Sequence, residues 1–86
     1  MDVDFTKAFN KQFDKLPRKK QQQARDAVAV FLDDVSATTL RNHGLKGEWL
    51  GYRSISAGGD LRLHYRVITT TRVLFVAVGS HSQLYK

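Results

Sequence analysis

The sequence contains no cysteine, which excludes disulfide bonds, thiolate metal sites and a cysteine nucleophile. It also lacks any apolar run close to the roughly 18 residues that a membrane-spanning helix needs, so a membrane partner is not expected. Residues 1–4 are acidic, whereas a secretory signal peptide starts with basic residues and continues with an apolar stretch. These absences predict a cytoplasmic protein whose stability depends on its own apolar core or on a partner chain.

Acidic residues are scarce, because 8 Asp and Glu stand against 14 Lys and Arg in a chain of 86 residues, giving a net charge of +6. Residues 44–86 hold six basic and two acidic side chains, so this half carries +4. Such a balance favours a polyanionic partner such as nucleic acid, although a soluble basic surface without a partner explains it equally well. With 42% hydrophobic and 26% charged residues the composition is that of a globular chain, and the length predicts one domain over residues 1–86.

Apolar side chains at spacings of four, four and three residues predict a helix over about residues 5–16. They are Phe5, Phe9, Phe13 and Leu16. Pro17 cannot continue this helix but suits the start of a second one, which runs to about Asp34. The short joint predicts an antiparallel helical hairpin. Lys7, Lys11 and Lys15 form a second stripe on the first helix, facing either water or an anionic partner.

The second half of the chain reads as β-structure. Residues 36–47 lose the helical period and predict an irregular segment, after which period-two alternation predicts strands over 49–56 and 61–68 joined by a turn. The apolar run 73–78 predicts a central strand that is covered on both faces. A short strand near Val3 is a further candidate. The expected architecture is α+β, with the N-terminal helical hairpin packed on one face of a three- or four-stranded antiparallel sheet.

The strand over residues 61–68 carries the most chemical information. Alternation places Arg62, His64 and Arg66 on the face opposite to its apolar side chains. If the helices cover the apolar face, the other face is open and cationic. Arginine suits a phosphate backbone, because its planar guanidinium offers a fork of donors and keeps its charge. The alternative is an exposed strand face that merely prevents edge aggregation.

Other kinds of site find little support. His43, His64 and His81 lie in three segments without metal-ligand spacing, so neither a metal site nor a cofactor is expected. No G-x-S-x-G nucleophile elbow occurs, and Gly58-Gly59 suits a turn better than a phosphate loop. A cationic face bordered by histidines and a tyrosine suits metal-independent RNA cleavage. There a base deprotonates the ribose 2′-hydroxyl, cations hold the phosphate, and an acid protonates the leaving 5′-oxygen.

Two motifs at this point resemble a known family. Residues 40–53 contain H-x-L-x-G-x-W-x-G-x-R, and residues 79–85 contain G-[ST]-H-x-x-L-[FY]. Both are similar to signatures of the YafQ branch of the RelE/ParE toxin superfamily, and with the helical hairpin the resemblance covers nearly the whole chain. It implies the RelE-like fold and a type II toxin that cuts mRNA on the ribosome. It also implies three partners: a cognate antitoxin protein, the ribosome, and mRNA or rRNA.

The resemblance also assigns roles to individual residues. The positions that match catalytic ones in the family are His43, Asp60, Arg62, His81 and Tyr85. Arg53 lies near the position of a catalytic lysine in the RelE branch. Together with the strand face, the lysine stripe and the motif segment, this gives a candidate set of RNA- and phosphate-binding residues: Arg53, His64, Arg66, Lys46, Lys7, Lys11 and Lys15.

Two positions depart from the YafQ pattern. Ser56 stands where such toxins usually have a second histidine, and Leu61 where they have a tryptophan. Slower chemistry, a different general base, and a protein that binds the ribosome but cuts poorly all remain open. Whether His64 replaces the missing histidine is open as well. The alternative function is a ParE-like, non-enzymatic toxin that inhibits DNA gyrase by binding, and a third is a basic RNA-binding domain without toxicity.

Overall fold

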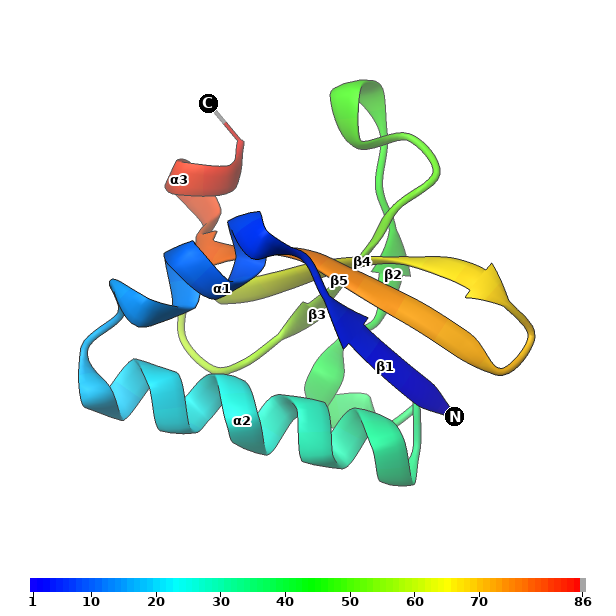
Figure 1. Ribbon diagram of the computed structural model, residues 1–86, viewed down its shortest axis with the longest axis horizontal. Helices are drawn as coiled ribbons and strands as arrows, with labels where there is room; N and C mark the ends of the chain where they lie inside the picture. Colours follow the sequence, from blue (N-terminus) through cyan, green and yellow to red (C-terminus); the bar gives the residue numbers. More distant parts are fainter. Residues whose placement is uncertain (86) are drawn as a thin grey trace.

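A computed structural model describes residues 1–85 (Figure 1). In chain order the elements are β1 (Asp2–Phe5), α1 (Lys7–Asp14), α2 (Arg18–Asp33), the 3-10 helix η1 (Thr38–Leu40), β2 (His43–Gly44), the 3-10 helix η2 (Gly47–Trp49), β3 (Arg53–Ser56), β4 (Leu61–Thr69), β5 (Arg72–Ser80) and α3 (His81–Leu84).

The strands form one five-stranded sheet in the order β1-β5-β4-β3-β2. β1 runs parallel to β5, and the other neighbours are antiparallel. The α+β class and the helical hairpin are confirmed. The candidate strand near Val3 is present as β1, but it pairs parallel with β5, so the sheet is mixed. The sheet has five strands where three or four were expected, because the two-residue β2 adds a further edge strand.

The start of α1 shows why the first helix is shorter than predicted. Phe5 fits the helical spacing, but it lies in β1, paired with Phe75. The Thr6 side chain accepts a hydrogen bond of 3.0 Å from the Phe9 backbone N–H, which is the geometry of a helix N-cap. The helix therefore begins after Thr6, and the preceding residues are free to pair with the sheet.

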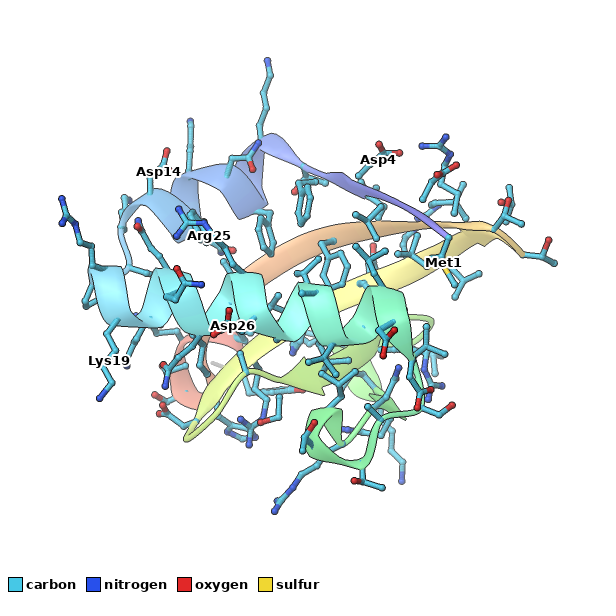
Figure 2. All side chains as sticks on the ribbon, turned by 90° about the horizontal axis from the view of Figure 1, so that it is seen from below. Met1, Asp4, Asp14, Lys19, Arg25 and Asp26 are labelled. Atoms are coloured by element: carbon cyan, nitrogen blue, oxygen red, sulfur yellow. The ribbon has the colours of Figure 1, made fainter. Side chains whose placement is uncertain are left out.

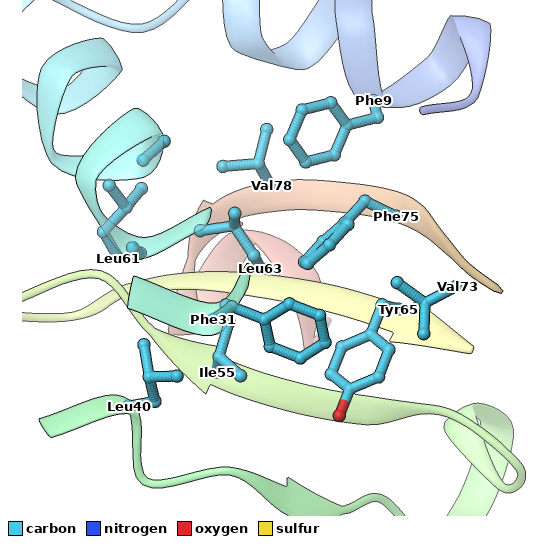
Figure 3. Packing of buried hydrophobic residues seen from close by; sticks show 12 residues of the cluster. Phe9, Phe31, Leu40, Ile55, Leu61, Leu63, Tyr65, Val73, Phe75 and Val78 are labelled. Atoms are coloured by element: carbon cyan, nitrogen blue, oxygen red, sulfur yellow. The ribbon is translucent and has the colours of Figure 1, made fainter. Parts of the chain in front are cut away.

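Aromatic rings form the centre of the core between the helices and the sheet (Figure 3). Phe31 of α2 packs edge-on against both Tyr65 and Phe75, with ring centroids 4.9 Å and 5.4 Å away. Phe9 of α1 reaches the same Phe75 ring. These contacts fix the apolar face of the sheet as the face that carries Tyr65 and Phe75, which is called the helix side below.

The outer surface of α2 is charged, as Figure 2 shows for Lys19 and Asp26. Arg25 points from α2 towards α1, where its guanidinium lies 5.1 Å from the centroid of the Phe13 ring. Within residues 1–85, no helix has the length and apolar character required to cross a membrane.

The opposite side of the sheet is partly covered by two short segments. Residues 49–52 were predicted to start a strand, but Trp49 ends η2 and β3 begins only at Arg53. In Figure 1 the η2 segment and α3 rise on the side of the sheet away from α2. This side is called the histidine side below, because His43, His64 and their paired neighbours share it.

Candidate active site

His64 lies at the centre of the histidine side and is fully buried, with a relative exposure of 0%. The sequence predicted that this residue lies on an open cationic face, and that prediction is wrong. The alternation along β4 is as expected, but Trp49 and Tyr85 lie over the imidazole with ring centroids 4.4 Å and 5.3 Å away. His64 therefore has no surface with which to contact a phosphate.

The surroundings of His64 keep its imidazole neutral. Neither ring nitrogen has a hydrogen-bond partner among the described residues, and the hydroxyl of the paired Ser54 is equally unpartnered. The pKa of His64 is lowered from 6.5 to about 4, chiefly by burial and in smaller part by the charges of His43 and His81. Tyr85 packs against the rings of both His64 and His81, and Ser54 is paired with both His43 and His64, so the three histidines form one group on this side of the sheet.

His43 reaches this group from the edge strand β2. It is directly paired with Ser54, which is in turn paired with His64, so the three residues share one face of the sheet. The His43 side chain is exposed, and its Nδ1 lies 2.8 Å from the Arg41 carbonyl oxygen. Nδ1 then carries the proton of the neutral ring, and Nε2 is left to act as a base.

His81 and Tyr85 come from the C-terminal end of the chain. His81 is the first residue of α3 and is exposed, and its ring lies 4.4 Å from that of Tyr85. A capping box starts α3, because the Ser80 side chain accepts from the Gln83 N–H while the Gln83 side chain accepts from the Ser80 N–H. The Asp60 carbonyl accepts from the His81 N–H at 3.0 Å, so the β3–β4 turn lies beside the start of α3.

Gly79 leaves room for the Gln83 side chain at this start of α3. A Cβ atom at position 79 would lie 2.9 Å from the Gln83 side-chain oxygen, which is too close for a van der Waals contact. The same oxygen accepts the Ser80 N–H in the capping box at 2.8 Å. The glycine in the G-S-H segment therefore lets the Gln83 side chain fold back and fix the direction in which His81 points.

Arg62 lies on the same side of the sheet, next to the β3–β4 turn. Its Nη1 group donates to Ser56 Oγ at 3.2 Å and to the carbonyl oxygens of Gly59 and Leu61. All three bonds use Nη1, which leaves Nη2 and Nε as donors for a ligand. Ser56, where the resemblance led us to expect the second histidine of YafQ-like toxins, thus holds this arginine and offers no imidazole.

The other predicted phosphate-binding residues are more widely spread. Arg66 and Lys46 are exposed, and Arg66 lies on the histidine side. Arg53 is paired with Tyr65 and lies on the helix side, where it donates through Nε to Asn42 Oδ1 at 2.9 Å. Three further candidates are exposed on α1 or at its C-cap, in the helix layer and not with the histidines: Lys7, Lys11 and Lys15.

Two hollows lie on opposite sides of the sheet. The larger one, of about 590 Å³, lies on the helix side and is lined by Phe31, Arg41 and Arg53 among others. A second, of about 410 Å³, lies between the η2 segment and α3 and is lined by Glu48, Trp49, Tyr52, Gln83 and Leu84. No histidine lines either hollow, but Trp49 of the second one packs against His64, so we take the surface around the histidines, next to this hollow, as the candidate site. Over residues 1–85, no three His, Cys, Asp or Glu side chains are arranged to hold a metal ion.

Trp49 is the residue that the sequence reasoning missed at this site. Its indole N–H donates to the Leu84 carbonyl at 3.1 Å, and its ring packs edge-on against His64 and Tyr52. The signal was present, since Trp49 is the single tryptophan of the chain and stands within the first motif. Placing it in a strand concealed that it bridges two distant segments.

Comparison with known proteins gives consistent matches. Over residues 1–86 the chain matches the family described as bacterial toxin of type II toxin-antitoxin system, YafQ. YafQ from E. coli strain BL21(DE3) has 21% sequence identity and a TM-score of 0.80, with 99% of this chain and 98% of that chain covered. The E. coli DinJ-YafQ toxin-antitoxin complex gives 23% identity and a TM-score of 0.74, with 99% and 97% covered. The RelBE2 toxin-antitoxin complex from Mycobacterium tuberculosis gives 30% identity and a TM-score of 0.63, with 93% and 96% covered. No curated protein matches the chain by sequence.

Proposed function

The chain belongs to the YafQ family of bacterial toxins of type II toxin-antitoxin systems, and we propose that it is an endoribonuclease that cuts mRNA bound to the ribosome. Its cleavage uses the ribose 2′-hydroxyl as the nucleophile. A cognate antitoxin protein neutralises it, in line with the complexes of its structural relatives. Its target places its action in the cytoplasm.

One observation carries the proposal: two exposed imidazoles, from segments far apart in the sequence, lie around the buried His64 on the side of the sheet that also carries Arg62. His43 comes from β2 and His81 from α3, and the charges of both act on the same buried His64. Imidazole is the side chain that most often serves as a general base or a general acid, so such a pair can supply both.

The proposed reaction balances with these groups alone. One imidazole removes the proton of the 2′-hydroxyl, and the resulting oxygen attacks the adjacent phosphorus. Arg62 stabilises the charge that develops on the phosphate oxygens. The bond from phosphorus to the 5′-oxygen breaks, and the other imidazole protonates that oxygen. Tyr85 orients the nucleotide by stacking. Asp60, in the adjacent β3–β4 turn, is the remaining catalytic candidate. The products are a 2′,3′-cyclic phosphate and a 5′-hydroxyl.

The test uses ribosomes programmed with a defined mRNA, with cut ends mapped by primer extension. We expect cleavage in the occupied A site, and products with a cyclic phosphate and a 5′-hydroxyl. A single 2′-O-methyl group at the cut nucleotide should abolish cleavage there, because it removes the nucleophile. Cleavage that persists with the 2′-O-methyl mRNA contradicts the proposed chemistry.

Ser56, in place of the histidine usual in YafQ-like toxins, is the reason to consider the ParE-like alternative. A second assay distinguishes the endoribonuclease from the gyrase inhibitor. Purified DNA gyrase is incubated with the protein and relaxed plasmid, and supercoiling is followed on a gel. The endoribonuclease proposal expects full supercoiling at protein concentrations that cut ribosomal mRNA. Intact mRNA together with blocked supercoiling would replace it with the gyrase function.

A further inference from the structure

The C-terminal helix α3 and the Tyr85 that follows it carry two candidate catalytic side chains, His81 and Tyr85, but the helix is too short to be stable alone. It spans four residues, His81–Leu84, and isolated helices of fewer than about 12 residues are marginal in water. The capping box and the Tyr85 N–H to His81 carbonyl bond lie within α3 and its flanks. They shape the helix but do not fix its place over the sheet.

Two hydrogen bonds among the described residues tie α3 to the rest of the fold. At its first residue the His81 N–H donates to the Asp60 carbonyl at 3.0 Å. At its last residue the Leu84 carbonyl accepts from Trp49 Nε1 at 3.1 Å. The last carbonyls of a helix have no partner within it, so the indole satisfies a group that would otherwise depend on water. Trp49 thus holds the free end of the helix.

Backbone hydrogen bonds and ring packing hold Trp49 itself in place. Its backbone N–H donates to the Lys46 carbonyl at 3.2 Å, and its carbonyl accepts from the Tyr52 N–H at 3.0 Å. Its ring lies at 84° to the buried ring of His64, which also packs against Tyr85. The buried His64 ring therefore supports the side chains of both Trp49 and Tyr85.

We propose that Trp49 is a positioning residue for cleavage, which holds α3 over the histidine side through the Leu84 carbonyl and the His64 ring. The effect of Trp49 on catalysis rests on the proposed function, since Trp49 would position His81 and Tyr85 to act on RNA. That Trp49 holds α3 in place is a claim about the free protein, and it is tested without any substrate.

The first test compares Trp49→Phe with the wild-type protein. Phenylalanine keeps a ring against His64 but removes the N–H donor. The net strength of one hydrogen bond corresponds to roughly two- to ten-fold in an equilibrium constant. We expect the His81 and Tyr85 amides to exchange with solvent about five-fold faster. We also expect kcat on programmed ribosomes to fall about five-fold, while ribosome affinity changes less than two-fold.

Val73→Ala is the matched control, because Val73 is a buried core residue at the other end of β5. It lowers global stability without touching α3, so it should leave kcat and the relative exchange of the α3 amides unchanged. The proposal is overturned if Trp49→Phe leaves amide exchange or kcat at the wild-type value. It is also overturned if Val73→Ala, at an equal loss of Tm, lowers kcat as much.

A second variant keeps the proposal testable if Trp49→Phe does not fold. Gly79→Ala disturbs the capping box from the other end, through the contact with Gln83, and leaves the only tryptophan in place. We expect Trp49 fluorescence to shift to longer wavelength and kcat to fall. An unchanged emission maximum with a lowered kcat contradicts a role for Trp49. If the wild-type protein cuts no RNA, the proposed function and the catalytic consequence both fail, while exchange and fluorescence still decide whether Trp49 holds α3.

Discussion

Arg53 donates from Nε to Asn42 Oδ1 at 2.9 Å on the helix side of the sheet, away from the histidines. Asn42 also donates to the Val35 carbonyl and contacts the Tyr65 hydroxyl. These contacts hold the residue immediately before His43, and the preceding Arg41 adopts a left-handed backbone conformation with φ of 48°. The network therefore fixes the path of the chain that carries His43, which is a different role from phosphate binding.

Asn42→Ala is expected to lower kcat about ten-fold, because three partners of the side chain lose their contact and the His43 segment becomes mobile. The loss of stability should be about 1–3 kcal/mol, since partly buried polar groups are left unpaired. Urea unfolding and the ribosomal cleavage assay measure the two effects. Asn10→Ala on the exposed surface of α1 is the control and should change neither. An unchanged kcat in folded Asn42→Ala would show that His43 needs no such support.

Arg62→Ala is expected to lower the cleavage rate by roughly 10² to 10³, the usual effect of removing one preorganised group at a developing charge. The fold should remain intact, because Arg62 lies at the surface beside a turn. Single-turnover cleavage on programmed ribosomes measures the effect, with Arg18→Ala on α2 as the matched arginine control. A folded Arg62→Ala protein that cuts at the wild-type rate would contradict the phosphate role.

The buried His64 predicts that stability falls with acidification. The pKa of His64 is about 4 in the folded chain, against 6.5 as its ordinary value. Between these values the unfolded chain binds a proton that the folded chain does not. The contribution of His64 to the free energy of unfolding is therefore complete above pH 6.5, and about 3 kcal/mol of stability is lost as the pH falls to 4.

Urea unfolding at several pH values between 7 and 4 measures this dependence, with His64→Phe as the reference. Phenylalanine keeps a ring between Trp49 and Tyr85 but does not titrate. The difference in stability between the two proteins should change by about 1.4 kcal/mol per pH unit below pH 6. Parallel curves for the two proteins would mean that His64 is not the group responsible.

The helices and the face of each β4 residue could be predicted from the sequence, because the spacing of apolar residues reflects which side of an element is buried. Phe5 shows the limit of this reasoning. Its spacing to Phe9 and Phe13 fits a helix, yet the Thr6 N-cap starts the helix only after Phe5. A four-residue strand such as β1 is too short to show a period of its own. The pairing of β1 with β5, which are far apart in the sequence, also produces no pattern in the neighbouring residues.

The side of β4 that the candidate residues share could be predicted from the sequence, but the burial of His64 could not. Alternation correctly placed Arg62, His64 and Arg66 on one side of β4, but it does not reveal what covers that side. The cover over His64 comes from Trp49 and Tyr85, which are separated from it by 15 and 21 positions. The same limit applies to Arg53, whose partner Asn42 belongs to a segment that the sequence described only as irregular.

Ribosome binding is expected to weaken steeply with salt, because neutralised phosphates release counterions. The log-log slope should be near −0.7 for each phosphate contacted on a single strand. Lys46→Gln and Arg66→Gln should each reduce the slope by about that amount if these exposed residues contact RNA. Lys19→Gln on the outer surface of α2 (Figure 2) is the control and should not change it. A salt-independent affinity would indicate a protein contact instead.

His81 is expected to act as the general acid or base of cleavage, because its exposed imidazole lies at the start of α3, where the Asp60 carbonyl and the capping box fix its direction. His81→Gln should keep the capping box, Tm and ribosome affinity, yet lose cleavage by roughly 10² or more. The pH-rate profile adds a second criterion, since the limb that reports the His81 proton should disappear. If His81→Gln melts early but cuts normally when folded, then His81 is structural, and the proton transfer must be assigned to His43 and Asp60.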